Sequence, residues 1–144
     1  MTQPPILLVE DNDDDADLAV MAFRDANIAN PILRVRDGVE AMAALHGDGS
    51  AEIALPVLVL LDLKLPRVSG IEVLKSIRAK ASTKHLPVVI LTSSDEETDR
   101  MQAYAHFANS YVRKPVDYDA FVDASRRLGL YWTMTNVPPP AVRP

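Results

Sequence analysis

Two uninterrupted apolar runs, residues 57–61 (VLVLL) and 87–91 (PVVIL), constrain the fold of this chain most strongly. A strand with one face in water alternates apolar and polar residues, whereas a strand covered on both faces has no polar side. Runs this short and this apolar therefore predict strands at the centre of a parallel sheet that carries helices on both faces.

Three further strand-like segments, 6–10, 32–35 and 110–113, complete the pattern. The last two are more polar, so we expect them at the edges of the sheet. Helical patterns separate the five segments. The expected helices are residues 14–28, a second from Gly38 to Gly47, a third capped by Ser69, a fourth capped by Ser94 or Asp95, and a fifth from Asp117 to about Leu130.

Five strand–helix units predict an α/β fold, a five-stranded doubly wound parallel sheet with right-handed crossovers and five helices. We expect one domain over residues 1–135, because 144 residues suffice for a single hydrophobic core. Residues 136–144 (NVPPPAVRP) cannot continue a helix and predict an extended, Pro-rich tail. Residues 47–56 form a turn-rich connection to which we assign no catalytic role.

Charge and composition narrow the class of protein. A net charge of −5 and a pI near 5.1 argue against nucleic-acid or membrane binding. The absence of cysteine excludes disulfides and thiolate metal sites and is compatible with a reducing cytosol. The N-terminal apolar run is too short for a signal peptide or a membrane segment, so we expect a cytoplasmic protein.

Polar residues follow four of the five strands. Glu10 and Asp11 follow the first strand and Asp62 the third, Thr92 follows the fourth, and Lys114 follows the fifth. In doubly wound sheets, ligands bind outside the carboxyl ends of the strands. We therefore expect three carboxylates, a hydroxyl and an ammonium group to converge at that edge.

Residues 10–17 (EDNDDDAD) hold six acids in eight positions. Packed carboxylates need a cation, and oxygen-only ligands suit Mg²⁺ rather than zinc. The alternative is that acids at a helix start interact favourably with the helix dipole. Both interpretations apply: we place Glu10 and Asp11 at the strand end. The later aspartates are expected to lie mostly in water at the helix start: Asp13, Asp14, Asp15 and Asp17.

Four short motifs, in order along the chain, carry a family resemblance: VED at 9–11, LLDLKLPRVSG at 60–70, ILTSS at 90–94 and YVRKP at 111–115. They include a D-x-x-x-P-x-x-x-G spacing from Asp62 to Gly70. Over residues 5 to about 130 the chain resembles a response-regulator receiver domain. This resemblance implies the flavodoxin-like strand order 2-1-3-4-5.

The resemblance also implies a chemistry. Asp62 corresponds to the phosphoacceptor, which takes a phosphoryl group from the phosphohistidine of a sensor histidine kinase. Asp11, Asp62 and the backbone carbonyl of Lys64 correspond to Mg²⁺ ligands, with Glu10 assisting through water. Lys114 corresponds to the cation that contacts the phosphoryl group.

A switch is implied as well. The Thr92 hydroxyl is expected to bond to the phosphoryl group, after which Tyr111 rotates from an exposed to a buried position. The fourth helix, fifth strand and fifth helix then form the output surface. The resemblance further implies a cis bond between Lys114 and Pro115. Lys64 and Ser94 stand where family members tune the hydrolysis of the acyl phosphate.

A narrower resemblance concerns the start VEDNDDDADL, the 47–56 connection and the ending GLYWTMTNVPPP, which are similar to single-domain regulators paired with phytochrome-type histidine kinases. It implies a stand-alone receiver whose kinase is a bacteriophytochrome, acting through protein binding or phosphorelay. We expect a homodimer, because Tyr and Trp are favoured interface anchors. The alternative is that Tyr131 and Trp132 pack on their own domain. The residues expected on the dimer and output face are Tyr104, Tyr111, Tyr131 and Trp132.

Three other classes of protein match parts of this pattern. A flavodoxin-like electron carrier shares the topology, but the first loop, VEDNDDD, would repel the phosphate of FMN. A haloacid-dehalogenase-type phosphatase requires an acid two residues after its nucleophile, and this chain has Lys64 at that position. A receiver that signals without phosphate is disfavoured because each required residue is present. We expect a phosphoacceptor that assists its own phosphorylation and dephosphorylation, not a conventional turnover enzyme.

Overall fold

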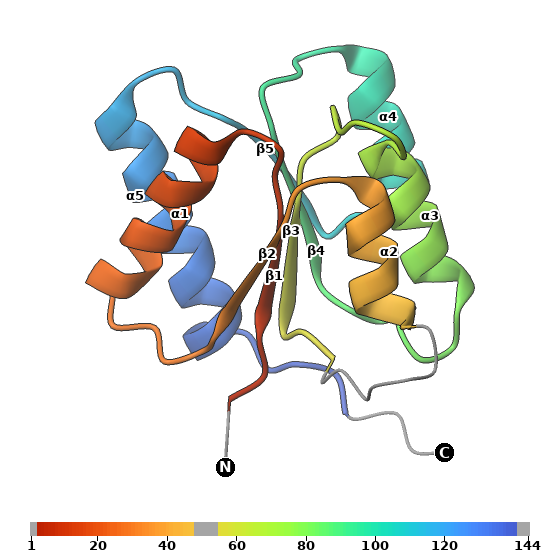
Figure 1. Cartoon of the computed structure of the whole chain (residues 1–144), viewed down its shortest axis with the longest axis horizontal. Helices are drawn as coiled ribbons and strands as arrows, with labels where there is room; N and C mark the ends of the chain where they lie inside the picture. The colour runs from red at the N-terminus through yellow and green to blue at the C-terminus, as the bar shows by residue number, and fades with distance from the viewer. Residues whose placement is uncertain (1–2, 48–54, 141–144) are drawn as a thin grey trace.

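The strand-like segments pair into one parallel sheet in the order β2-β1-β3-β4-β5. The computed structural model describes residues 3–47 and 55–140. In Figure 1, α1 and α5 cover one face of this sheet, and α2, α3 and α4 cover the other. The strands are β1 (Ile6–Val9), β2 (Ile32–Val35), β3 (Leu58–Leu61), β4 (Val88–Thr92) and β5 (Ser110–Arg113). The predicted fold class and strand order are confirmed.

Alternation of side chains across the sheet explains the apolar runs. In β3, Val59 and Leu61 join the cluster under α2, α3 and α4, whereas Leu58 and Leu60 join the cluster under α1 and α5. The side chains on both faces of β3 are therefore packed against other apolar residues, and their removal from water stabilises the fold. In β5 no residue is fully buried, which agrees with its predicted place at an edge.

Side chains cap most of the helices, as the sequence predicts. Ser69 Oγ accepts a hydrogen bond from the Glu72 N–H (3.3 Å), and the Asp117 carboxylate accepts one from the Ala120 N–H (3.0 Å). The expected cap of the fourth helix is wrong, because the helix begins at Glu97 and Glu96 is its cap without a side-chain bond. The helices are α1 (Asp13–Asp25), α2 (Gly38–His46), α3 (Gly70–Ala79), α4 (Glu97–Ala105) and α5 (Tyr118–Leu130).

The end of α5 continues into a π-helical turn, η1 (Tyr131–Thr135). Trp132 packs against the apolar cluster under α1 and α5, while Tyr131 leaves about half of its surface exposed (48%). Trp132 thus fits the expectation of packing on its own domain. Pro138, Pro139 and Pro140 line a cavity of about 240 Å³ with residues near the amino ends of the strands. Most of the 47–56 connection, residues 48–54, lies outside the described residues.

No helix in the described ranges 3–47 and 55–140 is long and apolar enough to cross a membrane.

Close packing at Gly70 explains why the D-x-x-x-P-x-x-x-G motif ends in a glycine. It opens α3 against the end of β3, and its N–H donates to the Leu63 carbonyl (3.0 Å). A Cβ at this position would lie 2.2 Å from the backbone oxygen of Asp62 and 2.6 Å from Leu63 Cα. Because these are backbone atoms that cannot rotate away, the segment carrying Asp62 fits closely only against a glycine.

We predict that Gly70→Ala lowers the free energy of unfolding by about 2 kcal/mol, the scale of overpacking a close contact. Urea denaturation measures this. Arg126→Ala, at an exposed position of α5, is the control and should leave the free energy of unfolding nearly unchanged. Equal losses in the two variants would contradict the backbone explanation.

Candidate phosphorylation pocket

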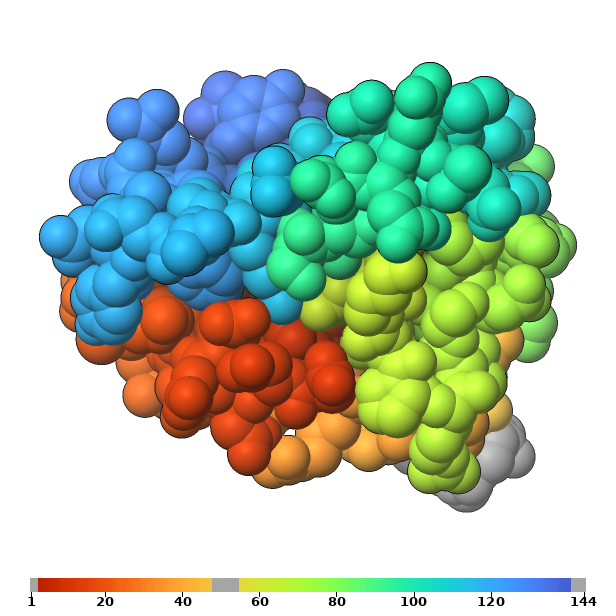
Figure 2. Space-filling view, turned by 90° about the horizontal axis from the view of Figure 1, so that it is seen from above, coloured from red at the N-terminus to blue at the C-terminus, as the bar shows by residue number. Residues whose placement is uncertain are grey.

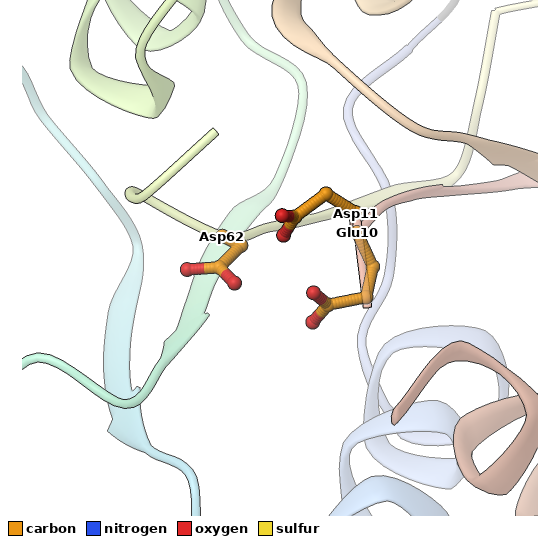
Figure 3. A group of neighbouring side chains, drawn as sticks. All are labelled: Glu10, Asp11 and Asp62. Atoms are coloured by element: carbon orange, nitrogen blue, oxygen red, sulfur yellow. The ribbon is translucent and has the colours of Figure 1, made fainter. Parts of the chain in front are cut away.

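The strand ends bring three acids together, as the sequence predicts. The carboxylates of Glu10, Asp11 and Asp62 each offer an oxygen within 4.8 Å of the others, and Figure 3 shows them around one common space. Glu10 and Asp62 are buried and Asp11 is exposed. A set of carboxylate oxygens open to water on one side suits a hard divalent cation.

Lys114 supplies the positive charge within this pocket. Its buried ammonium pairs with the carboxylate of Glu10 and lies 3.0 Å from both Asp62 Oδ2 and Asp15 Oδ2. The ammonium group expected at this edge of the sheet thus lies beside the Asp62 carboxylate. Asp15 was expected in water, and its side chain instead reaches into the pocket. Asp15 lies in the first turn of α1, and only the packing of that helix beside the segment after β5 brings it to Lys114.

The crowding of charge shifts two pKa values. Burial raises the pKa of Glu10 to about 7, although the hydrogen bond from Lys114 lowers it. Burial alone would lower the pKa of Lys114, but the hydrogen bond to Glu10 and the charge of Asp62 raise it above its ordinary value. Lys114 therefore stays charged, and the pKa of Glu10 rises because of its burial and, to a smaller extent, the charge of Asp62.

Both carboxylate oxygens of Asp62 accept hydrogen bonds. Thr92 Oγ1 donates to Asp62 Oδ1 (2.8 Å), and the backbone N–H of Lys64 donates to the same oxygen (3.3 Å). Lys114 donates to Asp62 Oδ2 (3.0 Å). Thr92 is fully buried as the last residue of β4. The Thr92 hydroxyl, expected to contact a phosphoryl group, already contacts the carboxylate that would carry it.

A second set of contacts links the pocket to α4. Tyr111, half-buried, donates from its hydroxyl to the Ser94 carbonyl (3.0 Å). Ser94 Oγ donates to Asp99 Oδ2 (2.6 Å), and the Lys64 ammonium lies 3.2 Å from the same oxygen. The bond from Ser94 lowers the pKa of Asp99, and the bond to Asp99 raises that of Lys64.

These segments meet on one surface. Figure 2, seen from above onto the carboxyl edge, shows the start of α1 in red, the loop after β3 in yellow-green and the start of α4 in green, side by side. Asp99 was not predicted from the sequence, because only the packing of α4 against the β3–α3 loop brings it to Lys64.

The peptide bond between Lys114 and Pro115 is trans, so the expected cis bond is wrong. A trans bond is favoured at X–Pro by about 0.5–1 kcal/mol. The Lys114 N–H donates to the Thr92 carbonyl (2.7 Å), which fixes the residue ahead of the proline. The ammonium therefore reaches the pocket without a cis bond.

The chain belongs to the response regulator receiver domain family, which its residues 6–126 match. Receiver domains are phosphorylation-activated signalling proteins that partner with histidine kinases and bind a divalent metal at this acidic pocket. Over 143 residues the chain is 35% identical to the response regulator Rcp1 of Synechocystis sp., covering 97% of each chain.

Three solved structures are similar over most of the chain. The phosphorylated cyanobacterial phytochrome response regulator RcpA has a TM-score of 0.91 at 34% identity, over 96% of this chain and 100% of that one. The Mn²⁺-bound form of Rcp1 gives 0.90 at 34%, with the same coverage. The bacteriophytochrome response regulator RtBRR gives 0.74 at 43%, over 97% and 86%.

We predict that Glu10→Gln flattens the pH dependence of stability in the metal-free protein. Between pH 4.5 and about 7 the folded chain keeps a proton on Glu10 that the unfolded chain has lost. The free energy of unfolding therefore falls as pH rises through that window and levels off above it. Urea denaturation in EDTA, at intervals from about pH 5 to about pH 8, measures the slope.

Glu97→Gln, at an exposed carboxyl in the first turn of α4, is the control and should leave the slope unchanged. A wild-type slope that Glu10→Gln does not reduce would show that Glu10 is not the group that titrates.

Proposed function

We propose that Asp62 is the phosphoacceptor of this response regulator. The observation that carries the proposal is the placement of its carboxylate: Thr92 and the Lys64 N–H bind one oxygen, and Lys114 binds the other. Three donors orient the two carboxylate oxygens, and Glu10 and Asp11 lie beside them. A carboxylate held in place next to candidate metal ligands is suited to nucleophilic attack on a phosphoryl group.

In the proposed transfer an Asp62 oxygen attacks phosphorus while the bond between phosphorus and the kinase's imidazole nitrogen breaks. The imidazole regains a proton from solvent. Lys114 donates to a phosphoryl oxygen in place of Asp62 Oδ2, and Thr92 donates to another. Hydrolysis reverses the state: water attacks phosphorus, inorganic phosphate leaves, and the Asp62 carboxylate is restored. In this way the pocket assists both reactions.

The oxygen ligands fit Mg²⁺ as the metal. Asp11, Asp62 and the Lys64 carbonyl would hold it directly, and Glu10 through water. When bound, the ion offsets the negative charge of the phosphoryl oxygens as the transfer proceeds. The three neighbouring carboxylates beside the Lys114 ammonium support this assignment, because they offer oxygen ligands and more negative charge than one ammonium neutralises.

The proposed switch uses Thr92 and Tyr111. Tyr111 is half-buried and bonded to Ser94, beside the hydroxyl that contacts Asp62. A phosphoryl group on Asp62 would strengthen the bond from Thr92 and stabilise this arrangement of the β4–α4 segment. The face of α4, β5 and α5 then binds another protein, or the phosphoryl group is relayed onward.

The comparisons support a bacteriophytochrome as the kinase. RcpA and RtBRR are described as a phytochrome and a bacteriophytochrome response regulator, and each is at least 34% identical to this chain. The resemblance spans at least 96% of the chain, including its C-terminal segment. We therefore assign the chain to a light-sensing two-component pathway.

Intact mass spectrometry after incubation with Mg²⁺ and acetyl phosphate tests the acceptor. We expect one phosphoryl adduct on the wild type, none on Asp62→Asn, and none in EDTA. Asp95→Asn, which removes an exposed carboxylate paired with Arg113, should keep the adduct. An adduct that persists in Asp62→Asn would overturn the assignment.

We also propose a homodimer through the α4–β5–α5 face, supported by the exposed rings of Tyr104 (51%) and Tyr131 (48%). Sedimentation of the wild type at increasing concentration should show dimers, and Tyr104→Ala with Tyr131→Ala should weaken them about tenfold or more. Leu33→Ala, at the exposed β2 edge, is the control. A wild type that stays monomeric with and without phosphorylation would contradict the proposal.

A further inference from the structure

Two routes lead from Asp62 to α4, and both end at Asp99. On the first, Thr92 Oγ1 donates to Asp62 and accepts from the Ser94 N–H (3.4 Å). Ser94 Oγ then donates to Asp99 Oδ2 (2.6 Å). Because Ser94 is buried, this chain of bonds has little competition from water.

The second route runs through Lys64. Its N–H donates to Asp62 Oδ1, and its side chain extends to Asp99, where the ammonium lies 3.2 Å from Oδ2. Within the described residues, Asp99 is the one carboxylate paired with Lys64. The interactions form a closed ring from Asp62 through Thr92, Ser94, Asp99 and Lys64.

We propose that Asp99 is a positioning residue that holds the Lys64 ammonium away from Asp62 until a phosphoryl group competes for it. This inference rests on the proposed phosphorylation of Asp62. A phosphoryl group brings about two negative charges at pH 7. Lys64 is a flexible side chain that starts at the pocket, so its ammonium can turn to the stronger anion.

The exchange gives α4 a direct response to phosphorylation. Asp99 lies in the first turn of α4, so it is released from Lys64 when the ammonium turns and keeps its bond from Ser94. The affinity of the pocket for a phosphoryl group is then set partly by a carboxylate outside it. Removing Asp99 tightens binding at Asp62, and removing Lys64 weakens it.

The Lys64 side chain is half exposed (57%), and this exposure decides which measurement can detect the exchange. Exposed ion pairs contribute little to folding, so a variant that breaks this one should keep its fold. The effect must then appear at the pocket, in affinity for an anion, and not in the unfolding temperature.

Calorimetric titration with beryllofluoride, a phosphoryl mimic, in Mg²⁺ tests the proposal. Asp99→Asn should bind about threefold more tightly than the wild type, the size expected of a partly exposed ion pair. Lys64→Met should bind more weakly. Asp99→Asn added to Lys64→Met should change nothing further, whereas added to Lys64→Arg it should again tighten binding.

The control Glu97→Gln removes a like charge from the same helical turn, with no ion pair to Lys64. It should leave the affinity unchanged. If Asp99→Asn tightens binding equally with Lys64 and with Met at that position, the effect is a general loss of charge and the inference is wrong. No tightening in Asp99→Asn would also overturn it.

Failure of the proposed function has a separate signature. A wild type that binds no beryllofluoride and forms no adduct would refute phosphorylation at Asp62 itself. Binding by the wild type that is lost in Asp62→Asn keeps the function, and the Lys64 and Asp99 variants then decide the inference alone.

Discussion

The ammonium of Lys114, enclosed by the carboxylates of Glu10, Asp15 and Asp62, is the interaction on which the pocket depends. Buried acids at this spacing repel one another, and without a cation one of them must take up a proton. Lys114 offsets part of that repulsion, but burial, together with the charge of Asp62, still raises the pKa of Glu10 to about 7. A pocket lined by carboxylate oxygens in this way suits a hard divalent cation.

The sheet determines where such a pocket can form. The central strands β1 and β3 are buried along their whole length, so a polar side chain can appear only beyond their last residues. Parallel pairing then brings those positions to one edge, with Val9 beside Leu61 in register. The fold that buries the apolar runs therefore also places the acids of the pocket together at one edge of the sheet.

Sequence patterns predict the elements and the pocket residues because both depend on local spacing. Strand ends fall where apolar runs stop, so Glu10, Asp62 and Lys114 could be placed before the fold was known. The roles of Asp15 and Asp99 could not, because each depends on how a helix packs against a loop distant in sequence. The bond before Pro115 is in the trans form that X–Pro bonds ordinarily favour, and the family pattern alone gave the wrong isomer.

Weak interactions suit a switch, and the proposed exchange at Asp99 relies on contacts of this kind. An equilibrium between two states responds to a ligand only by the difference in the ligand's affinity for them. A buried ion pair that had to break would oppose that difference, whereas the half-exposed pair of Lys64 and Asp99 is broken at small cost. Ser94 keeps its hydrogen bond to Asp99 when Lys64 turns away, so α4 stays linked to the segment after β4. Strong interactions at Lys114 fix the pocket, and weak ones at Lys64 let the rest of the molecule respond to it.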